Sequence, residues 1–333
     1  MSRFPFLALG AIGILLLVVG CTSSAAEESV DVLTIADSTG DWGYPSPYGH
    51  YARGPGYIRM SLIFDTLIWK DENGFVPALA ENWEYLSDEK AYVFNLREGV
   101  TWNDGEPFTA KDVAFTYEYI KDHPYQWVDP GIVESVEVSD DRTVKITLTR
   151  DYAPFLDQVV GTLPIMPEHV FKDVSDPAGF TDPEALTGTG PFKLVNYDKA
   201  QGTYLYEANE DYYQGAPRVK QIKFVKVSLE MSAAALEKGD VDAATVPGET
   251  VDGLKDNGYV VIKGTHDWLA KIMVNHRKAP FSDAKFRQAL YYAIDRQDLV
   301  KTGLRGYGLE GSPGLYASDN QWYNPDQEQY PYD

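Results

Sequence analysis

The chain has 333 residues, of which 44% are hydrophobic and 13% are aromatic, enough for two or three domains with apolar cores. Its formal net charge is −21 and it has no long basic run, which argues against a nucleic acid partner because like charges repel. The single cysteine is Cys21, so the chain cannot form an internal disulfide.

The first thirty residues have the pattern of an export signal followed by a tether. Arg3 precedes an apolar run that ends at Gly20, and Cys21 follows directly. This order predicts a lipoprotein signal peptide over residues 1–20 and lipidation at Cys21. A transmembrane anchor, or a signal cut elsewhere, is the alternative. Residues 21–30 are small, polar and acidic, which predicts a flexible tether.

Residues 31–36 are predicted to form a strand, which an aromatic loop over residues 37–57 follows. The loop has no regular period and is rich in Gly and Pro. Rigid aromatic loops that follow strands are good places for ligand contacts, although an ordinary packed loop fits the pattern equally well. The candidate contacts in it are Tyr44, Tyr48, Tyr51 and Arg53. Residues 59–69 are predicted to be helical, with one apolar side made of Met60, Ile63, Phe64 and Leu67.

Two hairpins and one capped helix are predicted between residues 79 and 148. Apolar runs at residues 83–86 and 91–96 flank a polar turn, and a similar polar turn at residues 139–142 joins two further strands. Thr109 begins a helix and Asp112 stands three residues later, the spacing of a capping box. Trp127 follows this helix and is either a candidate ligand contact or a core residue.

The next segment is predicted to alternate strands with a helix. Strands are expected at residues 193–196, 203–208, 221–227 and 241–245, and a helix at residues 228–238. Glycines at positions 188 and 190 do not form a phosphate loop, because Pro191 lacks a backbone N–H and no Lys-Ser/Thr pair follows.

Toward the end of the chain, residues 259–262 and 269–275 are predicted to form strands. A helix capped by Ser282 or Asp283 is expected to follow, and Asp295 is expected to cap a short helix. The apolar stripe of the first helix consists of Phe286, Ala289, Leu290, Ala293 and Ile294.

Three ordered sets of residues resemble the signature of the family 5 extracytoplasmic solute-binding proteins, the peptide- and nickel-binding receptors of ABC importers. The first set includes Trp83, Leu96-Arg97-Glu98-Gly99-Val100, Trp102, Asp104-Gly105, Phe108-Thr109-Ala110 and Asp112-Val113. The second is Gly188-Thr189-Gly190-Pro191-Phe192 with Asn209, Tyr212, Tyr213, Pro217 and Val219. The third is Asn275, Pro280-Phe281, Asp283, Arg287-Gln288-Ala289-Leu290 and Ala293-Ile294-Asp295-Arg296.

The resemblance implies a two-lobed α/β fold of the periplasmic-binding-protein type, similar to type II, cluster C. Lobe I would comprise residues 31–73 and 161–247, and an inserted β-rich subdomain would span residues 74–160. Residues 248–333 would begin lobe II. Members of the family continue further, so a second lobe that is incomplete and a C-terminally truncated chain are expected.

The resemblance also implies a receptor that delivers a ligand to ABC permease subunits by hinge closure. An oligopeptide or dipeptide is the favoured ligand, and a nickel chelate or an oligosaccharide is the alternative. Further candidate contacts are Thr245, Pro247 and Asn275. The protein is expected to lie at the outer face of the cytoplasmic membrane or in the periplasm, held by a lipid on Cys21.

No catalytic or metal-binding motif stands out. The five histidines lack zinc-ligand spacing, and no Gly-x-Ser-x-Gly turn or Walker loop is present. We therefore expect no enzymatic activity, no cofactor and no metal. The rival hypotheses are a secreted hydrolase with an unrecognised site and a sensory ectodomain.

Overall fold

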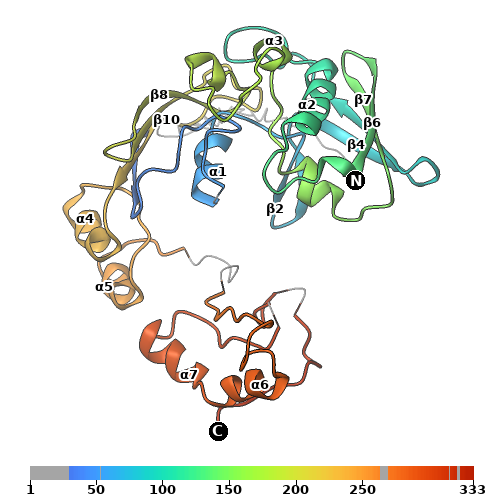
Figure 1. The fold of residues 1–333 in the computed structure, drawn as a ribbon. Helices are drawn as coiled ribbons and strands as arrows, with labels where there is room; N and C mark the ends of the chain where they lie inside the picture. The colour runs from blue at the N-terminus through green and yellow to red at the C-terminus, as the bar shows by residue number, and fades with distance from the viewer. Residues whose placement is uncertain (1–29, 53, 263–268, 315, 321–322) are drawn as a thin grey trace, which may run out of the picture.

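The computed structural model describes residues 30–52, 54–262, 269–314, 316–320 and 323–333, and its elements form two four-stranded sheets, a short ribbon and a set of helices (Figure 1). The predicted signal peptide, Cys21 and Arg53 lie outside the described residues. Within the described ranges, no helix is both long enough and apolar enough to cross a membrane.

The first sheet has the order β1-β10-β9-β8. These strands are β1 (Val30–Asp37), β10 (Val219–Lys226), β9 (Thr203–Ala208) and β8 (Phe192–Asp198). β1 runs parallel to β10, and the other two pairs are antiparallel. Because side chains alternate along a strand, one face buries Phe224 and Tyr206 against Met60 of helix α1 (Gly54–Ser61). Val30 pairs with Val219 as the first residue of β1, so the prediction that the tether includes Val30 was wrong.

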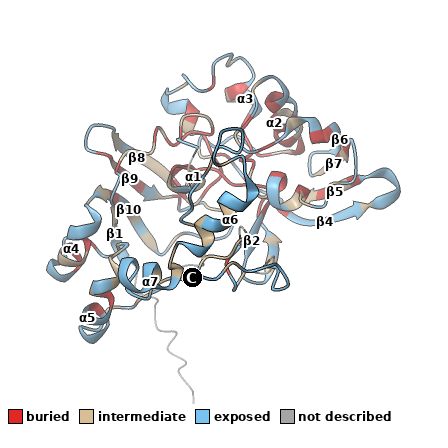
Figure 2. Cartoon of the chain, turned by 60° about the horizontal axis from the view of Figure 1, so that its bottom comes forward, coloured by how far each residue is buried: buried red, intermediate tan, exposed pale blue. Residues whose placement is uncertain are grey.

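The second sheet is antiparallel throughout, with the order β4-β5-β7-β6. Its strands are β4 (Ala80–Leu86), β5 (Ala91–Leu96), β7 (Thr143–Leu148) and β6 (Val133–Asp140), so both predicted hairpins are confirmed. Phe94, Val144 and Ile146 are fully buried in one cluster with Val113 and Tyr117 of helix α2 (Ala110–Asp122). In Figure 2, buried residues mark the interface between α2 and this sheet. The ribbon pairs β2 (Ile68–Asp71) with β3 (Gly74–Pro77).

The predicted capping box of α2 is confirmed. The carboxylate of Asp112 accepts from the N–H of Thr109 at 2.9 Å, and the hydroxyl of Thr109 accepts from the N–H of Lys111 at 3.3 Å. Asp112 also accepts from the N–H of Glu168 at 3.0 Å, which ties α2 to helix α3 (Glu168–Phe171). The cap therefore both begins a helix and fixes a long-range contact.

We expect Thr109→Ala to lower the free energy of unfolding by about 1 kcal/mol, because an N–H at the start of α2 loses its side-chain acceptor. Urea denaturation followed by circular dichroism measures this change. The matched control is Thr181→Ala, since Thr181 is exposed and makes no hydrogen bond to another described residue. An equal loss in both variants would show that the cap does not stabilise α2.

The predicted helix over residues 59–69 was wrong in its extent. α1 ends at Ser61, and Ile68 and Trp69 belong to β2. The chain leaves the helical path because the carbonyls of Leu62 and Ile63 accept from the N–H groups of Phe192 at 2.9 Å and Gly190 at 2.7 Å. The four residues of the predicted apolar side are nevertheless buried: Met60, Ile63, Phe64 and Leu67.

Three other predicted strands are absent from the described chain. In residues 241–245, Ala243 makes one isolated bridge to Ile35. The N–H of Thr34, which would donate to a backbone carbonyl in a longer ladder, donates to the side chain of Asp242 at 2.7 Å. Residues 259–262 and 269–275 form no strand either, and Val260 and Met273 are 89% and 83% exposed. A strand needs a neighbour, and none of the described residues pairs with residues 259–262 or 269–275.

The helices of the remaining chain begin largely where their caps predict. α4 (Ser232–Lys238) follows the 3₁₀ turn η5 (Leu229–Met231), and α5 (Val251–Asp256) follows η6 (Gly248–Thr250). Asp283 caps α6 (Ala284–Tyr292) and Asp295 caps α7 (Arg296–Asp298), as predicted. The stripe of α6 is not buried, since Phe286 is 37% exposed. The other 3₁₀ turns are η1 (Ser87–Glu89), η2 (Pro130–Ile132) and η4 (Pro183–Leu186), and the short π-helices are η3 (Leu156–Val160) and η7 (Leu299–Gly303).

Candidate functional site

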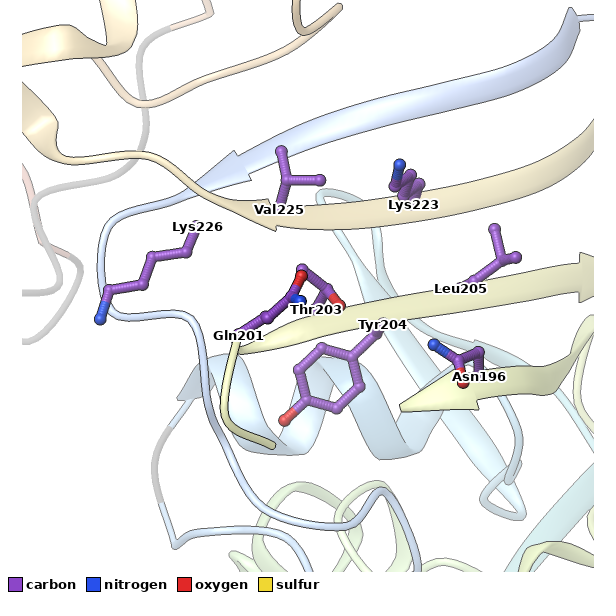
Figure 3. A pocket seen from close by; sticks show the side chains of 8 residues that line it. All are labelled: Asn196, Gln201, Thr203, Tyr204, Leu205, Lys223, Val225 and Lys226. Carbon is purple, nitrogen blue, oxygen red and sulfur yellow. The ribbon is translucent and has the colours of Figure 1, made fainter. Parts of the chain in front are cut away.

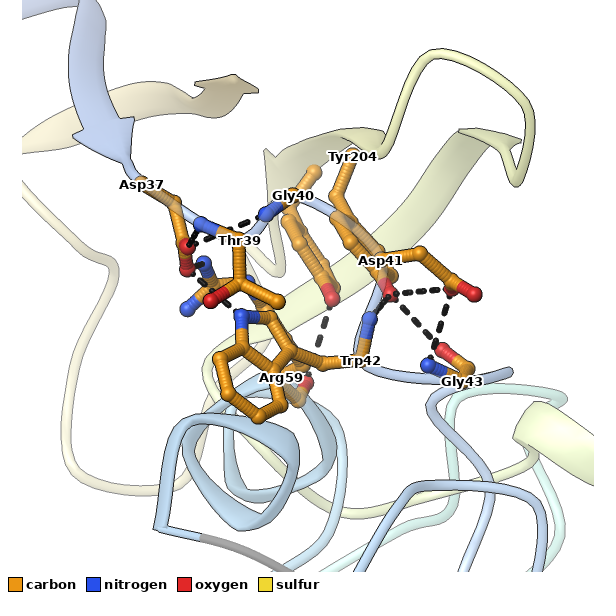
Figure 4. Close-up of polar contacts among 9 residues, drawn as sticks. Asp37, Thr39, Gly40, Asp41, Trp42, Gly43, Arg59 and Tyr204 are labelled. Carbon is orange, nitrogen blue, oxygen red and sulfur yellow. Dashed lines mark hydrogen bonds and ion pairs between the residues drawn. The ribbon is translucent and has the colours of Figure 1, made fainter. Parts of the chain in front are cut away.

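The aromatic loop was predicted over residues 37–57, but residues 54–57 belong to α1. The loop is held at its start by a buried ion pair (Figure 4). Nη2 of Arg59 lies 2.6 Å from Oδ2 of Asp37, and the indole N–H of Trp42 donates to the same oxygen at 2.8 Å. The guanidinium carbon of Arg59 lies 3.3 Å from the ring centroid of Phe224. Removing either charge would leave the other without an opposite charge in a largely buried place, so the pair fixes where the loop departs from β1.

Asp41 is the second fixed point of the loop. Its carboxylate accepts from the hydroxyls of Tyr197 at 2.5 Å and Tyr51 at 2.9 Å and from the N–H of Gly43 at 3.0 Å. Burial alone would raise the pKa of Asp41, but the bonds from Tyr197, Gly43 and Tyr51 outweigh it and hold that pKa below 3.8. The hydroxyl of Tyr204 also donates to the carbonyl of Gly43 at 2.8 Å. The first half of the loop is therefore rigidly positioned.

The second half of the loop is joined to residues 123–128, which follow α2. The hydroxyl of Tyr48 donates to the carbonyl of His123 at 2.6 Å, and Nε2 of His50 lies 3.2 Å from the hydroxyl of Tyr125. Burial lowers the pKa of His50, despite an opposing contact with the Tyr51 carbonyl, so the ring is neutral at pH 7. These contacts bring two loops together that lie more than seventy residues apart in the sequence.

Trp127 is the exposed aromatic residue of this junction. Its side chain is 55% exposed, and its φ of 67° lies in the left-handed region, which bulky residues rarely adopt. Its ring centroid lies 6.4 Å from that of Tyr57, whose hydroxyl donates to the carbonyl of Thr162 at 3.1 Å. A flat aromatic surface that the backbone holds toward solvent can stack on an apolar or planar group.

The structure brings only part of the predicted site together. Tyr44, Tyr48 and Tyr51 lie in the aromatic loop, and Trp127 adjoins it through Tyr57. The hydroxyl of Tyr44 donates to the carbonyl of Asp182 at 3.4 Å, and the hydroxyl of Tyr51 donates to the carboxylate of Asp41.

The other predicted contacts lie apart from this junction. Thr245 is exposed, and Pro247 directly precedes η6. Oδ1 of Asn275 accepts from the N–H of Arg277 at 3.0 Å, inside its own turn. Among the residues that the structure describes, no hydrogen bond or ring contact joins these three to the aromatic loop.

Two hollows lie near these elements. The larger, of about 540 Å³, covers the outward face of β8, β9 and β10, where Lys223 and Leu205 point away from the buried ring of Tyr204 (Figure 3). The smaller, of about 180 Å³, lies between α1 and β2, and we call it the α1–β2 pocket. Its lining residues are Tyr57, Ser61, Phe64, Thr66, Trp69, Lys70 and Gly161. The sequence did not predict this pocket, because Trp69 was expected at the end of a helix.

Asp65 is fully buried and lies in the sequence between Phe64 and Thr66, two residues that line the α1–β2 pocket. Its oxygens lie 3.4 Å from the hydroxyl of Thr189 and 3.5 Å from that of Tyr212. Burial raises the pKa of Asp65 to about 7, although hydrogen bonds from Tyr213 and Trp69 oppose the shift. Trp69 itself lines the α1–β2 pocket.

Nothing in the described ranges gathers three or more His, Cys, Asp or Glu side chains where they could hold a metal ion. The chemistry of the junction is aromatic and hydrogen-bonding.

Sequence comparisons place these features in a family. The family model described as bacterial extracellular solute-binding proteins, family 5 Middle, matches residues 74–333. The chain is 29% identical over 285 residues to the dipeptide-binding protein of Escherichia coli (strain K12). It is 32% identical over 294 residues to heme-binding protein A of Haemophilus influenzae. These matches cover 78% and 79% of this chain but 52% of each relative, so the chain spans about half the length of these relatives.

Solved structures agree on the fold. The periplasmic binding protein DppA from Helicobacter pylori, in complex with the peptide STSA, superposes with a TM-score of 0.76 at 24% identity over 92% of this chain and 64% of its own. NikZ from Campylobacter jejuni, in complex with Ni(L-His), gives a TM-score of 0.74 at 25% identity over 92% of this chain and 61% of its own. The chain belongs to the bacterial extracellular solute-binding proteins of family 5 and has their two-lobed α/β fold.

Proposed function

We propose that the chain is an extracytoplasmic receptor that captures an oligopeptide or dipeptide and delivers it to an ABC permease. The observation that carries this proposal is the exposed ring of Trp127, held by a left-handed backbone beside Tyr57 at the edge of the aromatic loop. The relative from Escherichia coli, a dipeptide-binding protein, supports peptide as the ligand class. Nickel chelates and oligosaccharides are the competing classes.

The proposed mechanism is hinge closure. Residues 31–73 and 161–247 would form lobe I with residues 74–160 inserted, and residues 248–333 would begin lobe II. The backbone of residues 244–246 makes no hydrogen bond to another described residue, although it continues from the bridge between Ala243 and Ile35. An extended peptide can add to such a free edge through its main chain. The proposed contacts are Tyr44, Tyr48, Tyr51, Arg53, Trp127, Thr245, Pro247 and Asn275. Closure would bury the ligand between both lobes.

We further propose that a lipid on Cys21 holds the mature protein at the outer face of the membrane after removal of residues 1–20. Labelling with a radioactive fatty acid in the producing cell tests this proposal. Loss of the label in Cys21→Ser, together with release of the protein into the medium or periplasm, is the expected result. Retention of the label at Cys21→Ser would contradict it.

We expect Trp127→Ala to weaken binding of Ala-Phe and Ala-Ala-Ala at least about tenfold, because the variant loses an aromatic stacking surface. Isothermal titration calorimetry on the whole chain measures the change. Tyr332→Ala is the matched control, since Tyr332 is 57% exposed and its side chain makes no hydrogen bond or ring contact with another described residue. Binding of the nickel–histidine complex but of neither peptide would replace the peptide proposal with the chelate class.

A further inference from the structure

The α1–β2 pocket adjoins the surface on which the proposed function depends. Tyr57 forms one wall of the pocket and also lies 6.4 Å from the ring of Trp127. We propose that this pocket receives one aromatic or bulky aliphatic side chain of the bound peptide and so determines which peptides bind. This inference rests on the proposed function, since it assigns a side-chain specificity to the same site.

The walls of the pocket are chemically apolar, although three of the lining residues carry hydroxyls. The hydroxyl of Tyr57 donates to the carbonyl of Thr162 at 3.1 Å, and that of Thr66 donates to the carbonyl of Ile68 at 2.5 Å. The hydroxyl of Ser61 donates to the carbonyl of Ile58 at 3.2 Å. Because each hydroxyl hydrogen is already engaged inside the protein, none of the three residues can donate to a polar side chain that enters the pocket.

Aromatic rings supply most of the remaining surface. Phe64 is buried at the base, and Trp69 is 41% exposed. Gly161 adds no side chain to the opposite wall. A hollow of about 180 Å³ with such walls fits one large apolar side chain.

The charged groups lie at the rim. Nζ of Lys70 lies 2.7 Å from Oδ1 of Asp157, and both side chains are 50% exposed. The two charges cancel, so the rim does not select strongly for a ligand of either sign. The side chains of Lys70 and Asp157 can still form hydrogen bonds with main-chain groups of a peptide whose side chain enters the pocket. Figure 1 shows α1 and β2 extending toward the part of the chain that carries α6.

The first test compares peptides that differ at one side chain. Calorimetry on the whole chain should show Ala-Phe-Ala and Ala-Leu-Ala binding at least about tenfold more tightly than Ala-Ala-Ala, because a large apolar side chain leaves water. Ser61→Phe, which fills the pocket, and Trp69→Ala, which removes a wall, should reduce this preference below about threefold while Ala-Ala-Ala still binds. Tyr85→Ala, at an exposed aromatic residue of β4, is the matched control and should keep the full preference.

A second probe separates the pocket from the receptor function. N-acetyl-4-fluorophenylalaninamide carries the side chain without a longer peptide, and its ¹⁹F line should broaden with the wild-type chain but not with Ser61→Phe. If the peptides bind with no preference and both variants match the wild type, the pocket proposal is overturned and the receptor proposal stands. If no peptide binds but the ¹⁹F line broadens only with an open pocket, the pocket stands and the peptide receptor is overturned. If neither binds, both are overturned.

Discussion

Gly188→Ala should destabilise the protein by about 3 kcal/mol or more, because an added Cβ has no room and the backbone around it cannot move away. The Cβ would lie 2.0 Å from the carbonyl oxygen of Ile63 and 2.8 Å from its carbonyl carbon. Gly188 also accepts from the N–H of Asn103 at 2.9 Å, and Gly190 donates to the same carbonyl of Ile63 at 2.7 Å. A shift large enough to relieve the clash would break these bonds.

Thermal and urea unfolding of the purified variant measure the loss. Gly253→Ala is the matched control, because nothing lies within 4 Å of its Cβ position and Gly253 lies within α5. Alanine is the better helix former, so this control should be neutral or stabilising by about 0.5–1 kcal/mol. A small effect at both positions would show that the close approach of Gly188 to Ile63 does not constrain the fold.

Asp65→Asn should remove a pH dependence of stability worth up to roughly 4 kcal/mol, the difference between an ordinary and a raised pKa. The pKa of Asp65 is about 7 in the folded chain and 3.8 is its ordinary value, because burial disfavours the charged form. Below pH 3.8 the carboxyl is protonated in both states and the favourable contribution is fully present. As the pH rises to 7, the unfolded state loses its proton first, and this contribution to stability is lost.

Urea denaturation at pH 5 and pH 8 measures the effect. The wild-type free energy of unfolding should fall between these values by more than that of Asp65→Asn. At pH 8 the variant should be the more stable protein, since it buries no charge. A second variant, Thr189→Val, removes a hydroxyl that lies 3.4 Å from the carboxyl and should increase the fall. If the wild type and Asp65→Asn changed equally with pH, Asp65 would not be the titrating group.

The local elements were largely predictable from the sequence. The two hairpins follow from alternating apolar runs around polar turns, and α2 follows from Thr109 and Asp112. Asp283 and Asp295 likewise begin α6 and α7. These signals succeed because the interactions that they describe join residues that are close in the sequence.

The predictions of secondary structure were wrong where the outcome depends on hydrogen bonds with distant segments of the chain. The predicted helix over residues 59–69 is broken because the carbonyls of Leu62 and Ile63 bond to Phe192 and Gly190. The apolar residues of that stretch are buried as their spacing predicts, but they do not lie on one continuous helix. Residues 259–262 and 269–275 have the composition of strands, but composition supplies no partner strand.

The sequence by itself determined the positions of turns, caps and apolar faces, and it carried the ordered motifs that the family match bears out. Only the tertiary structure decided that Trp127 adopts a positive φ beside Tyr57, and that Trp69 lines a pocket between α1 and β2. The physical reason is distance along the chain. A cap joins residues three positions apart, whereas Asp65 meets Thr189 across 124 positions, and no local pattern encodes which distant groups will share a buried space.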